Sequence, residues 1–286
     1  MHRFEANLAG PSAAGLFQGS NGVLYGTTVT GGSYNLGTVF QITTNGSLSI
    51  LASFDGTNGA KPYANVIQAS DGNLYGTASA GGQFNLGTIF VWNTNAGLMN
   101  LVSFNRTNGA NPYSGLIETT AGNFLGTCYS GGDSNNGTIF QANANGDLTT
   151  MISFSGTNGS YPKTGLNKAS DGLFYGTTVS GGMFSQGTVF QFQGNGVINQ
   201  IYSFDGTNGS GPCSGVIRAS DGQLYGTCQY GGAQGYGNVY KLTTNGVVTT
   251  IFSFDYARGS QPKAALVETA PGTFFGTTSD GGTYNG

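Results

Sequence analysis

The stretch of sequence that decides the fold is LYGTASAGGQFNLGTIF, residues 74–90. Related stretches recur along the whole chain, and their first residues are Leu24, Phe124, Phe174, Leu224 and Phe274. Successive stretches therefore start 50 residues apart, at positions 24, 74, 124, 174, 224 and 274. A fixed period of this length is typical of repeat proteins, in which each repeat forms one supersecondary unit.

The period divides residues 1–286 into a single array of repeat units. The units run over about 4–53, 54–103, 104–153, 154–203, 204–253 and 254–286. The last unit stops in the middle of the repeat, and Phe4 is in register with Phe54 near the other end. We therefore expect five complete units and a truncated sixth, in a chain that is a fragment of a longer protein.

The composition is that of a folded, glycine-rich protein with few charges. The chain has 52 glycines, and only 7% of its residues are charged. Hydrophobic residues make up 37%, including 19 Phe and 15 Tyr, so the chain can build a core. The net charge is −3, and the nine Lys and Arg are scattered. Because nucleic-acid binding depends on clustered basic residues, we expect no nucleic-acid partner.

Each unit predicts four short strands and no helix. In the unit that contains the opening stretch, the strands are expected at 64–68, 74–77, 87–92 and 98–104. Tight turns are expected at Asp71-Gly72 and Asn95-Ala96-Gly97, where glycine supplies the positive φ that such turns need. Apolar residues do not follow the helical period. Short connections between successive strands predict an antiparallel meander.

Adjacent apolar residues within the strands predict how the sheets pack. Leu74-Tyr75 and Ile89-Phe90 place apolar side chains on both faces of one sheet. A single sheet cannot bury both faces, whereas four-stranded sheets stacked radially can. We therefore predict an all-β fold, a β-propeller of four-stranded antiparallel blades. An open β-solenoid is the alternative, although its repeats are usually shorter.

Short and long connections alternate along each unit, so they separate to opposite ends of the sheet. In the unit described above, the two longer loops are residues 79–86 and 105–112. We call the end that carries these loops the loop rim, and the end that carries the tight turns 70–72 and 95–97 the turn rim. Function is expected at the loop rim, because binding residues lie on loops more often than on the scaffold.

An aromatic residue follows the Gly-Gly pair of the loop rim in most units. These candidate ligand-binding residues are Tyr34, Phe84, Phe184, Tyr236 and Tyr284. A flat ring among Asn and Gln side chains suits sugar binding, since it offers an apolar face beside polar groups. The alternative is that the rings pack over the neighbouring blade and close the interface between blades.

A Thr-Asn-Gly sequence recurs in the other long loop. Its asparagines are also candidate ligand-binding residues: Asn58, Asn108, Asn158 and Asn208. The alternative is that each Asn only forms a turn through its own backbone neighbours.

The sequence resembles the GloVer (Gloeo_Verruco) tandem repeats of bacterial surface proteins. The resemblance rests on the pattern G-x-I-x-A-S-D-G-x-x-Y-G-T-x-x-x-G-G-x-x-x-x-G-T-V-F, followed by T-x-x-G-x-x-x-x-x-x-S-F and D-G-T-N-G-x-x-P. The pattern extends over essentially the whole chain. The resemblance implies an exported bacterial protein, located outside the cell or at its surface, and it brings no catalytic residues with it.

Few residues of this chain suit catalysis or metal binding. The only histidine is His2, so neither a Ser-His-Asp triad nor a Cys/His zinc site is expected. The remaining catalytic option is a pair of loop-rim acids that cleaves glycosides. The acids are Asp55, Asp133, Asp205, Asp255 and Asp280. Alternatively, the Asp residues start turns or contribute to a calcium loop. We predict no catalytic residues, no metal and no cofactor.

The three cysteines are too few for a disulfide scaffold. Cys128 and Cys228 occupy a strand position where other units have Thr or Ala, so we expect small buried residues there. Cys213 and Cys228 flank one hairpin turn, which leaves a cross-strand disulfide open.

The sequence therefore favours a non-catalytic, exported repeat protein that binds ligands or presents a surface. Multivalent binding of surface or extracellular glycans is the most specific version. The alternatives are a propeller hydrolase or lyase that acts on polysaccharide through loop-rim carboxylates, and a structural spacer.

No apolar run approaches the ~18 residues that span a bilayer. We also expect association through the edges of the unfinished last blade.

Overall fold

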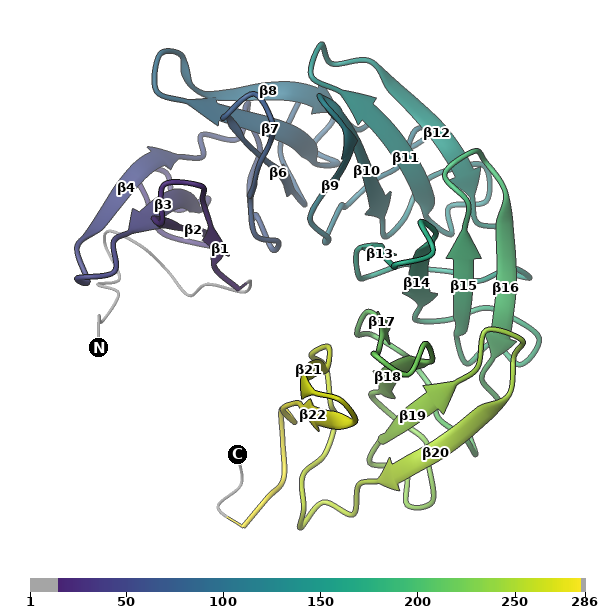
Figure 1. The fold of residues 1–286 in the computed structure, drawn as a ribbon. Helices are drawn as coiled ribbons and strands as arrows, with labels where there is room; N and C mark the ends of the chain where they lie inside the picture. Colours follow the sequence, from purple (N-terminus) through teal and green to yellow (C-terminus); the bar gives the residue numbers. More distant parts are fainter. Residues whose placement is uncertain (1–14, 284–286) are drawn as a thin grey trace. The chain divides into compact units, whose positions relative to one another are not determined.

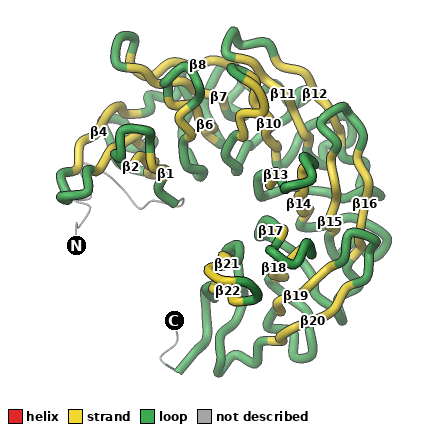
Figure 2. The backbone as a smooth tube through the Cα atoms, in the orientation of Figure 1, coloured by secondary structure: helices red, strands yellow, loops and turns green. Residues whose placement is uncertain are grey.

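The computed structural model describes residues 15–283, and all regular structure in that range is strand (Figures 1 and 2). The strands form five four-stranded sheets and one two-stranded sheet, here called blades. Sequential strands are neighbours in every sheet, and their pairing is antiparallel. The all-β fold and the division into five complete blades and a partial sixth are thus confirmed. Phe4 and His2 lie outside the described residues.

The chain divides into two compact units, Met1–Met151 and Ile152–Gly286, and the boundary falls inside β12. The first unit contains the blades β1–β4 and β5–β8 and most of the blade β9–β12. The strands are β1 (Phe17–Gln18), β2 (Leu24–Thr28), β3 (Thr38–Ile42), β4 (Leu48–Ser53), β5 (Ile67–Gln68), β6 (Leu74–Ala78), β7 (Thr88–Asn93), β8 (Gly97–Ser103), β9 (Ile117–Thr120), β10 (Asn123–Cys128), β11 (Thr138–Asn143) and β12 (Leu148–Ser153).

The second unit contains the blades β13–β16 and β17–β20 and the two-stranded sheet β21–β22. The strands are β13 (Asn167–Lys168), β14 (Phe174–Thr178), β15 (Thr188–Phe192), β16 (Ile198–Ser203), β17 (Ile217–Arg218), β18 (Leu224–Cys228), β19 (Asn238–Leu242), β20 (Val248–Ser253), β21 (Val267–Ala270) and β22 (Thr273–Phe275).

The first strand of most blades is shorter than the sequence predicts. In the second blade, β6, β7 and β8 begin and end within one residue of the expected bounds, but β5 contains only Ile67–Gln68 rather than 64–68. The carbonyl of Ala64 accepts a hydrogen bond from Thr27 Oγ1 of the preceding blade, at 2.8 Å. The backbone before β5 is therefore bonded to the neighbouring blade and not to β6.

The core of each blade is built on a glycine that faces an aromatic ring. Gly76 in β6 is the cross-strand partner of Phe90 in β7. A Cβ added to Gly76 would lie 2.4 Å from Phe90 Cζ, so the ring occupies the space that a side chain would need. The same pair recurs in the other complete blades as Gly26–Phe40, Gly126–Phe140, Gly176–Phe190 and Gly226–Tyr240. These strand glycines therefore mark positions of close packing.

A buried phenylalanine at the end of each of the first four blades joins it to the next. Phe54 follows β4 and packs against Phe90 of the second blade, with ring centroids 5.0 Å apart. Equivalent contacts within one unit are Phe104–Phe140, Phe154–Phe190 and Phe204–Tyr240. All residues of β6 are buried, so both faces of the sheet are covered, as the sequence predicts.

Candidate ligand-binding rim

The Gly-Gly loop of a blade is hydrogen-bonded to the long loop that leads into the same blade. In the second blade, Gly82 N of the loop 79–86 donates to Gly56 O, which lies between β4 and β5, at 2.8 Å. Ala60 and Ala80 exchange two backbone hydrogen bonds, of 2.7 and 3.0 Å. At the predicted loop rim of this blade, the two loops therefore form one hydrogen-bonded layer. Its loops are fixed in position before any ligand arrives.

The tip of the Gly-Gly loop has a backbone conformation that few residues adopt. Gly81 and Gly82 have φ values of 78° and 74°, and Asn85 has a φ of 55°. The Asn85 side chain stabilises this conformation, because its Oδ1 accepts a hydrogen bond from Gly81 N at 3.0 Å. Asn35 and Asn135 make the same bond in their blades. The residue just before each Asn is thus presented on a rigid turn.

The aromatic candidates of the loop rim are exposed to solvent. The exposed fractions are 64% for Tyr34, 50% for Phe84, 51% for Phe184 and 39% for Tyr236. Rings sealed between blades would be buried, as Phe54 and Phe90 are, so these four rings do not close a blade interface. Tyr236 also contacts the ring of Tyr256, with centroids 5.5 Å apart. Tyr284 lies outside the described residues.

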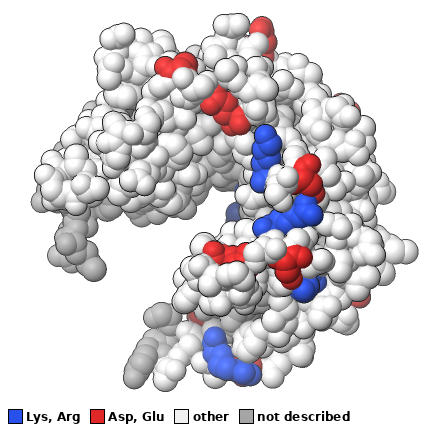
Figure 3. Space-filling view, in the orientation of Figure 1, with Lys and Arg blue, Asp and Glu red and all other residues white. Residues whose placement is uncertain are grey.

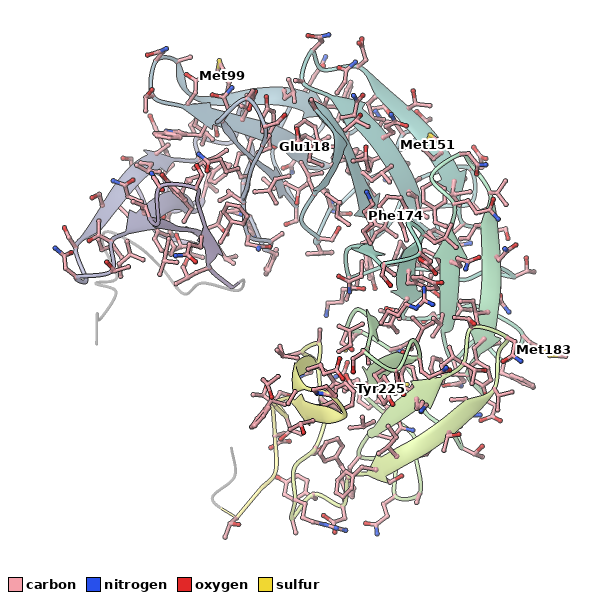
Figure 4. All side chains as sticks on the ribbon, viewed as in Figure 1. Met99, Glu118, Met151, Phe174, Met183 and Tyr225 are labelled. Carbon is pink, nitrogen blue, oxygen red and sulfur yellow. The ribbon has the colours of Figure 1, made fainter. Side chains whose placement is uncertain are left out.

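The residue beside Phe184 is also exposed. Met183 has an exposed fraction of 82%, and Figure 4 shows it at the outer edge of the ribbon, directed into solvent. The backbone amide of Met183 donates to Ser203 Oγ at 2.8 Å, so its own position in the loop is fixed.

The asparagines of the Thr-Asn-Gly loops take part in turns through one of their two polar atoms. Asn58 Oδ1 accepts from Asp55 N at 3.1 Å, and Asp55 Oδ1 accepts from Asn58 N at 3.0 Å. Asn108 and Asn158 make the first of these bonds in their loops. The Nδ2 groups of these three asparagines make no hydrogen bond within residues 15–283 and remain available as donors. Asn208 differs, because its Nδ2 donates to Tyr202 OH.

The loop-rim carboxylates also stabilise turns. Asp205 Oδ1 accepts from the hydroxyl and the amide of Thr207, at 2.8 and 2.9 Å. The Thr207 hydroxyl and neighbouring backbone amides hold the pKa of Asp205 below its usual value. Asp255 is paired with Arg258, which likewise lowers the pKa of this carboxyl. A general acid needs a raised pKa instead, so neither carboxyl is suited to that role.

Two of the other predicted acids are also held by hydrogen bonds. Asp55 accepts from Thr57 and Asn58, and Asp280 Oδ1 accepts from Gly281 N at 2.8 Å. Asp133 lies in the Gly-Gly loop of the third blade. Over the described part of the chain, His, Cys, Asp and Glu nowhere form a group of three that could hold a metal ion.

The cysteines are buried and reduced. Cys128, Cys213 and Cys228 are free thiols, so the cross-strand disulfide that the sequence left open is not formed. Cys128 and Cys228 occupy the buried strand position predicted for them, and burial raises the pKa of both thiols. They are therefore neutral packing residues and not nucleophiles.

One group of polar residues was missed by the sequence analysis. Lys168 and Arg218 line one cavity of about 280 Å³ in the second unit, on the turn rim. The nine basic residues had looked scattered along the chain. An alignment of the repeats would have shown that Lys168 and Arg218 stand at one repeat position, which is Gln or Glu in the other units.

A model of the Gloeobacter/Verrucomicrobia repeat matches residues 10–220 and 167–286 of the sequence. The two ranges overlap and together cover nearly the whole chain. No curated protein sequence is significantly similar to this chain. Among the residues described, no helix is long and apolar enough to cross a membrane.

Solved structures of β-propeller proteins are similar to this chain in fold. Virginiamycin B lyase from Staphylococcus aureus has a TM-score of 0.58 at 16% identity, covering 90% of this chain and 73% of its own. A streptogramin B lyase has a TM-score of 0.57 at 14% identity, covering 91% and 75%. A gluconolactonase from Xanthomonas campestris has a TM-score of 0.50 at 13% identity, covering 97% and 85%. At these identities the similarity identifies the β-propeller fold alone.

Proposed function

Because the chain belongs to the Gloeobacter/Verrucomicrobia repeat family, we propose that it is a non-catalytic, exported bacterial repeat protein that binds ligands at its loop rim. Multivalent glycan binding is the specific form of this proposal. One observation carries it: exposed aromatic rings stand in the Gly-Gly loop of four of the five complete blades, at one loop position for Tyr34, Phe84 and Phe184 and two residues later for Tyr236. Single exposed rings are common on protein surfaces, but recurrence at one loop position is not.

The chemistry of this rim suits a carbohydrate. A ring such as Phe84 can cover the apolar face of a sugar, while amide donors such as Asn58 Nδ2 can bond its hydroxyls. The loop that carries Phe84 is already fixed by the Asn85–Gly81 hydrogen bond. A rigid loop loses little conformational entropy when a ligand binds, which favours binding even by a small contact area.

Repetition would compensate for weak individual sites. Each of these four blades offers one aromatic ring and a few donors, so we expect a single site to bind weakly. A polysaccharide that contacts several sites binds the second and later ones intramolecularly, which raises the overall affinity. The proposed partner is therefore a repeating glycan outside the cell or at its surface.

An enzyme that acts on polysaccharide through loop-rim carboxylates is the second candidate. Exposed Asp55 and Asp205 at one loop position of two blades favour it. Their roles in turns and the lowered pKa of each weigh against it. A structural spacer without a ligand is the third candidate.

We also propose that copies of this chain associate through the two-stranded sheet. β22 pairs with β21, and its other edge pairs with no strand in the described residues. Phe275 in β22 is 62% exposed. An exposed strand edge with an apolar side chain favours pairing with another chain.

A glycan array with the whole chain, together with incubation of polysaccharide with the protein, separates the three candidate functions. The first candidate predicts binding to a subset of glycans and no change in polysaccharide length after long incubation. The enzyme predicts shortened polysaccharide that is lost in Asp205→Asn, whereas the spacer predicts neither binding nor cleavage. Failure to bind any glycan would contradict the proposed function.

A further inference from the structure

Neighbouring blades are joined at the turn rim by a receptor for a side-chain oxygen. We use the word receptor for a pair of donors, the backbone N–H and the hydroxyl of the serine in an A-S-D-G or G-S-N-G turn. The oxygen that they bind belongs to a side chain in the first strand of the next blade. Ser70 N and Ser70 Oγ donate to the two carboxylate oxygens of Glu118, at 2.9 and 2.7 Å. Ser220 binds Glu268 in the same way, at 2.8 Å for both bonds.

The first blade uses the same receptor for an amide oxygen. Ser20 N and Ser20 Oγ donate to Gln68 Oε1, at 2.9 and 3.0 Å. The serine and its acceptor are 48 residues apart in all three cases. The receptor is therefore a repeated feature of the fold, and it accepts either a neutral amide or a carboxylate.

The receptor favours an ionised carboxylate where the acceptor is glutamate. Hydrogen bonds from Gly272 N and from the backbone and hydroxyl of Ser220 lower the pKa of Glu268. The bonds stabilise the charged form, since N–H and O–H donors bind a carboxylate more strongly than a carboxylic acid.

In the fourth blade, the receptor at Ser170 has no acceptor side chain opposite it. The residue 48 positions after Ser170 is Arg218, which can only donate hydrogen bonds. Neither Ser170 N nor Ser170 Oγ forms a hydrogen bond within the described residues, and Ser170 is exposed. The A-S-D-G turn itself is unchanged, because Leu173 N still donates to Asp171 Oδ1 at 3.0 Å.

The place of the missing acceptor is a cavity with basic side chains on its wall. The cavity of about 280 Å³ is lined by Ser170, Lys168 and Arg218, together with Asn167, Tyr175 and Val216. Lys and Arg side chains gather beside β13 and β17 on the face drawn in Figure 3. The empty receptor therefore opens into a pocket of positive charge.

The charges of the pocket add up to a net positive value. Arg218 forms an ion pair with Asp171, and its Nε donates to Gly222 O at 3.1 Å. Its Nη2 makes no hydrogen bond within residues 15–283. Lys168 forms no ion pair with any described residue, and its Nζ lies 5.9 Å from the centroid of the Phe174 ring. Lys168 is therefore the uncompensated charge of this pocket.

We propose that this cavity is a binding site for the carboxylate group of a small ligand. The carboxylate takes the place that Glu118 and Glu268 occupy in the other receptors. Ser170 N and Oγ donate to its oxygens, and Lys168 and Arg218 Nη2 supply positive charge. An acidic amino acid and a sugar acid present the same carboxylate chemistry. The site lies on the turn rim, so it is independent of the proposed glycan-binding loop rim.

The test follows the amide signal of Ser170 by NMR while a ligand is added to the whole chain. N-acetylglutamate α-amide represents an acidic amino acid, and methyl glucuronide represents a sugar acid. Their neutral counterparts are N-acetylglutamine amide and methyl glucoside. We expect at least one acid to cause a saturable shift of the Ser170 signal, with binding about tenfold or more weaker for its neutral counterpart. The acid that binds more tightly identifies the source of the carboxylate.

The decisive variant is Arg218→Glu, which restores the internal acceptor found beside Ser70 and Ser220. Asp71 and Glu118 already coexist in such an arrangement, and no lysine stands beside Asp71 at the position that Lys241 holds beside Asp221. We expect it to weaken binding of the acid at least about tenfold, and to raise the melting temperature. Lys168→Met should weaken binding without any gain in melting temperature. Ser70→Ala, which changes a receptor that is already filled, should leave binding of the acid unchanged.

Three results would overturn the proposal. The first is the absence of a saturable Ser170 shift with either acid at several tens of millimolar. The second is equal binding of an acid and its neutral counterpart. The third is wild-type affinity in both Arg218→Glu and Lys168→Met.

Discussion

At the scale of single residues, one position of the blade core departs from its repeat. The ring that faces the strand glycine is Phe in four complete blades and Tyr240 in the fifth. Tyr240 is fully buried, and its hydroxyl has no hydrogen-bond partner in the described part of the chain. Burial also raises the pKa of Tyr240, so the hydroxyl remains neutral. An unsatisfied buried hydroxyl destabilises a fold.

We therefore expect Tyr240→Phe to stabilise the protein. Removing the unpaired hydroxyl should raise the free energy of unfolding by about 1 kcal/mol. The measurement is the midpoint of urea unfolding. The matched control is Tyr175→Phe, whose hydroxyl donates to Asp171 Oδ2 at 2.8 Å. The control should lower the midpoint, and two shifts of the same sign would show that the buried hydroxyl of Tyr240 is not the cause.

The strand glycine makes a second prediction at this scale. Gly176→Val should lower the free energy of unfolding by about 1–3 kcal/mol, because the new side chain collides with the ring of Phe190. Gly15→Val is the control, since no atom of residues 15–283 lies within 4 Å of its added Cβ. Thermal unfolding followed by circular dichroism measures both. An unchanged melting temperature in Gly176→Val would mean that the position is not closely packed.

At the scale of elements, hydrogen bonds from buried threonines attach one blade to the next. Thr77 Oγ1 in β6 donates to Ser114 O, which lies 37 residues later, at 2.6 Å. Thr27 and Thr177 make the same bond to Ala64 O and Ser214 O. Because of these bonds, the backbone just before the first strand of a blade is bonded to the preceding blade and not to its own sheet. First strands such as β5 and β17 are therefore short.

Replacing one of these threonines tests this attachment. Thr77→Val keeps the shape of the side chain but leaves Ser114 O without that donor. We expect a loss of about 1–3 kcal/mol in the free energy of unfolding. Thr249→Val, at an exposed position of β20, is the control and should change little. Equal stability of the two variants would contradict the role of the buried hydroxyl.

The sequence predicts the strands better than the hydrogen bonds that join one blade to the next. The 50-residue period, the apolar pairs and the Asx-Gly turns are local signals, and they were enough to place β6, β7 and β8 within a residue. The loop rim followed from connection lengths, and the exposure of Phe84 fits its place in a loop. The contact of Ser70 with Glu118 has no local signal, because it joins residues 48 apart through the packing of two blades. For the same reason the empty receptor at Ser170 was not predicted.

At the scale of the whole molecule, the proposed association of copies through the edge of β22 makes a prediction. If chains associate there, the sedimentation coefficient should rise with protein concentration. Phe275→Lys should suppress this rise, since a charge on an edge strand opposes pairing with another chain. Val247→Lys, which changes another exposed apolar residue away from that edge, is the control and should associate as the wild type does. Association that is equal in both variants would place the contact elsewhere.

The central claim is that the loop rim binds glycans through several equivalent rings. Its most direct test is the affinity for an immobilised glycan, chosen from the array, across a series of variants that lose one, two and four rings. Serine is the replacement, because Ser134 stands at this loop position in the third blade. The series is Phe84→Ser, then Tyr34→Ser/Phe84→Ser, then all four described rings changed to Ser, with Met183→Ser as the control on the same loop.

We predict that apparent affinity falls with each ring removed, while the melting temperature stays near that of the wild type, because the rings are exposed. Avidity from several weak sites gives such a stepwise loss. Met183→Ser should bind as the wild type does. A variant without the four rings that keeps the wild-type affinity would contradict the account.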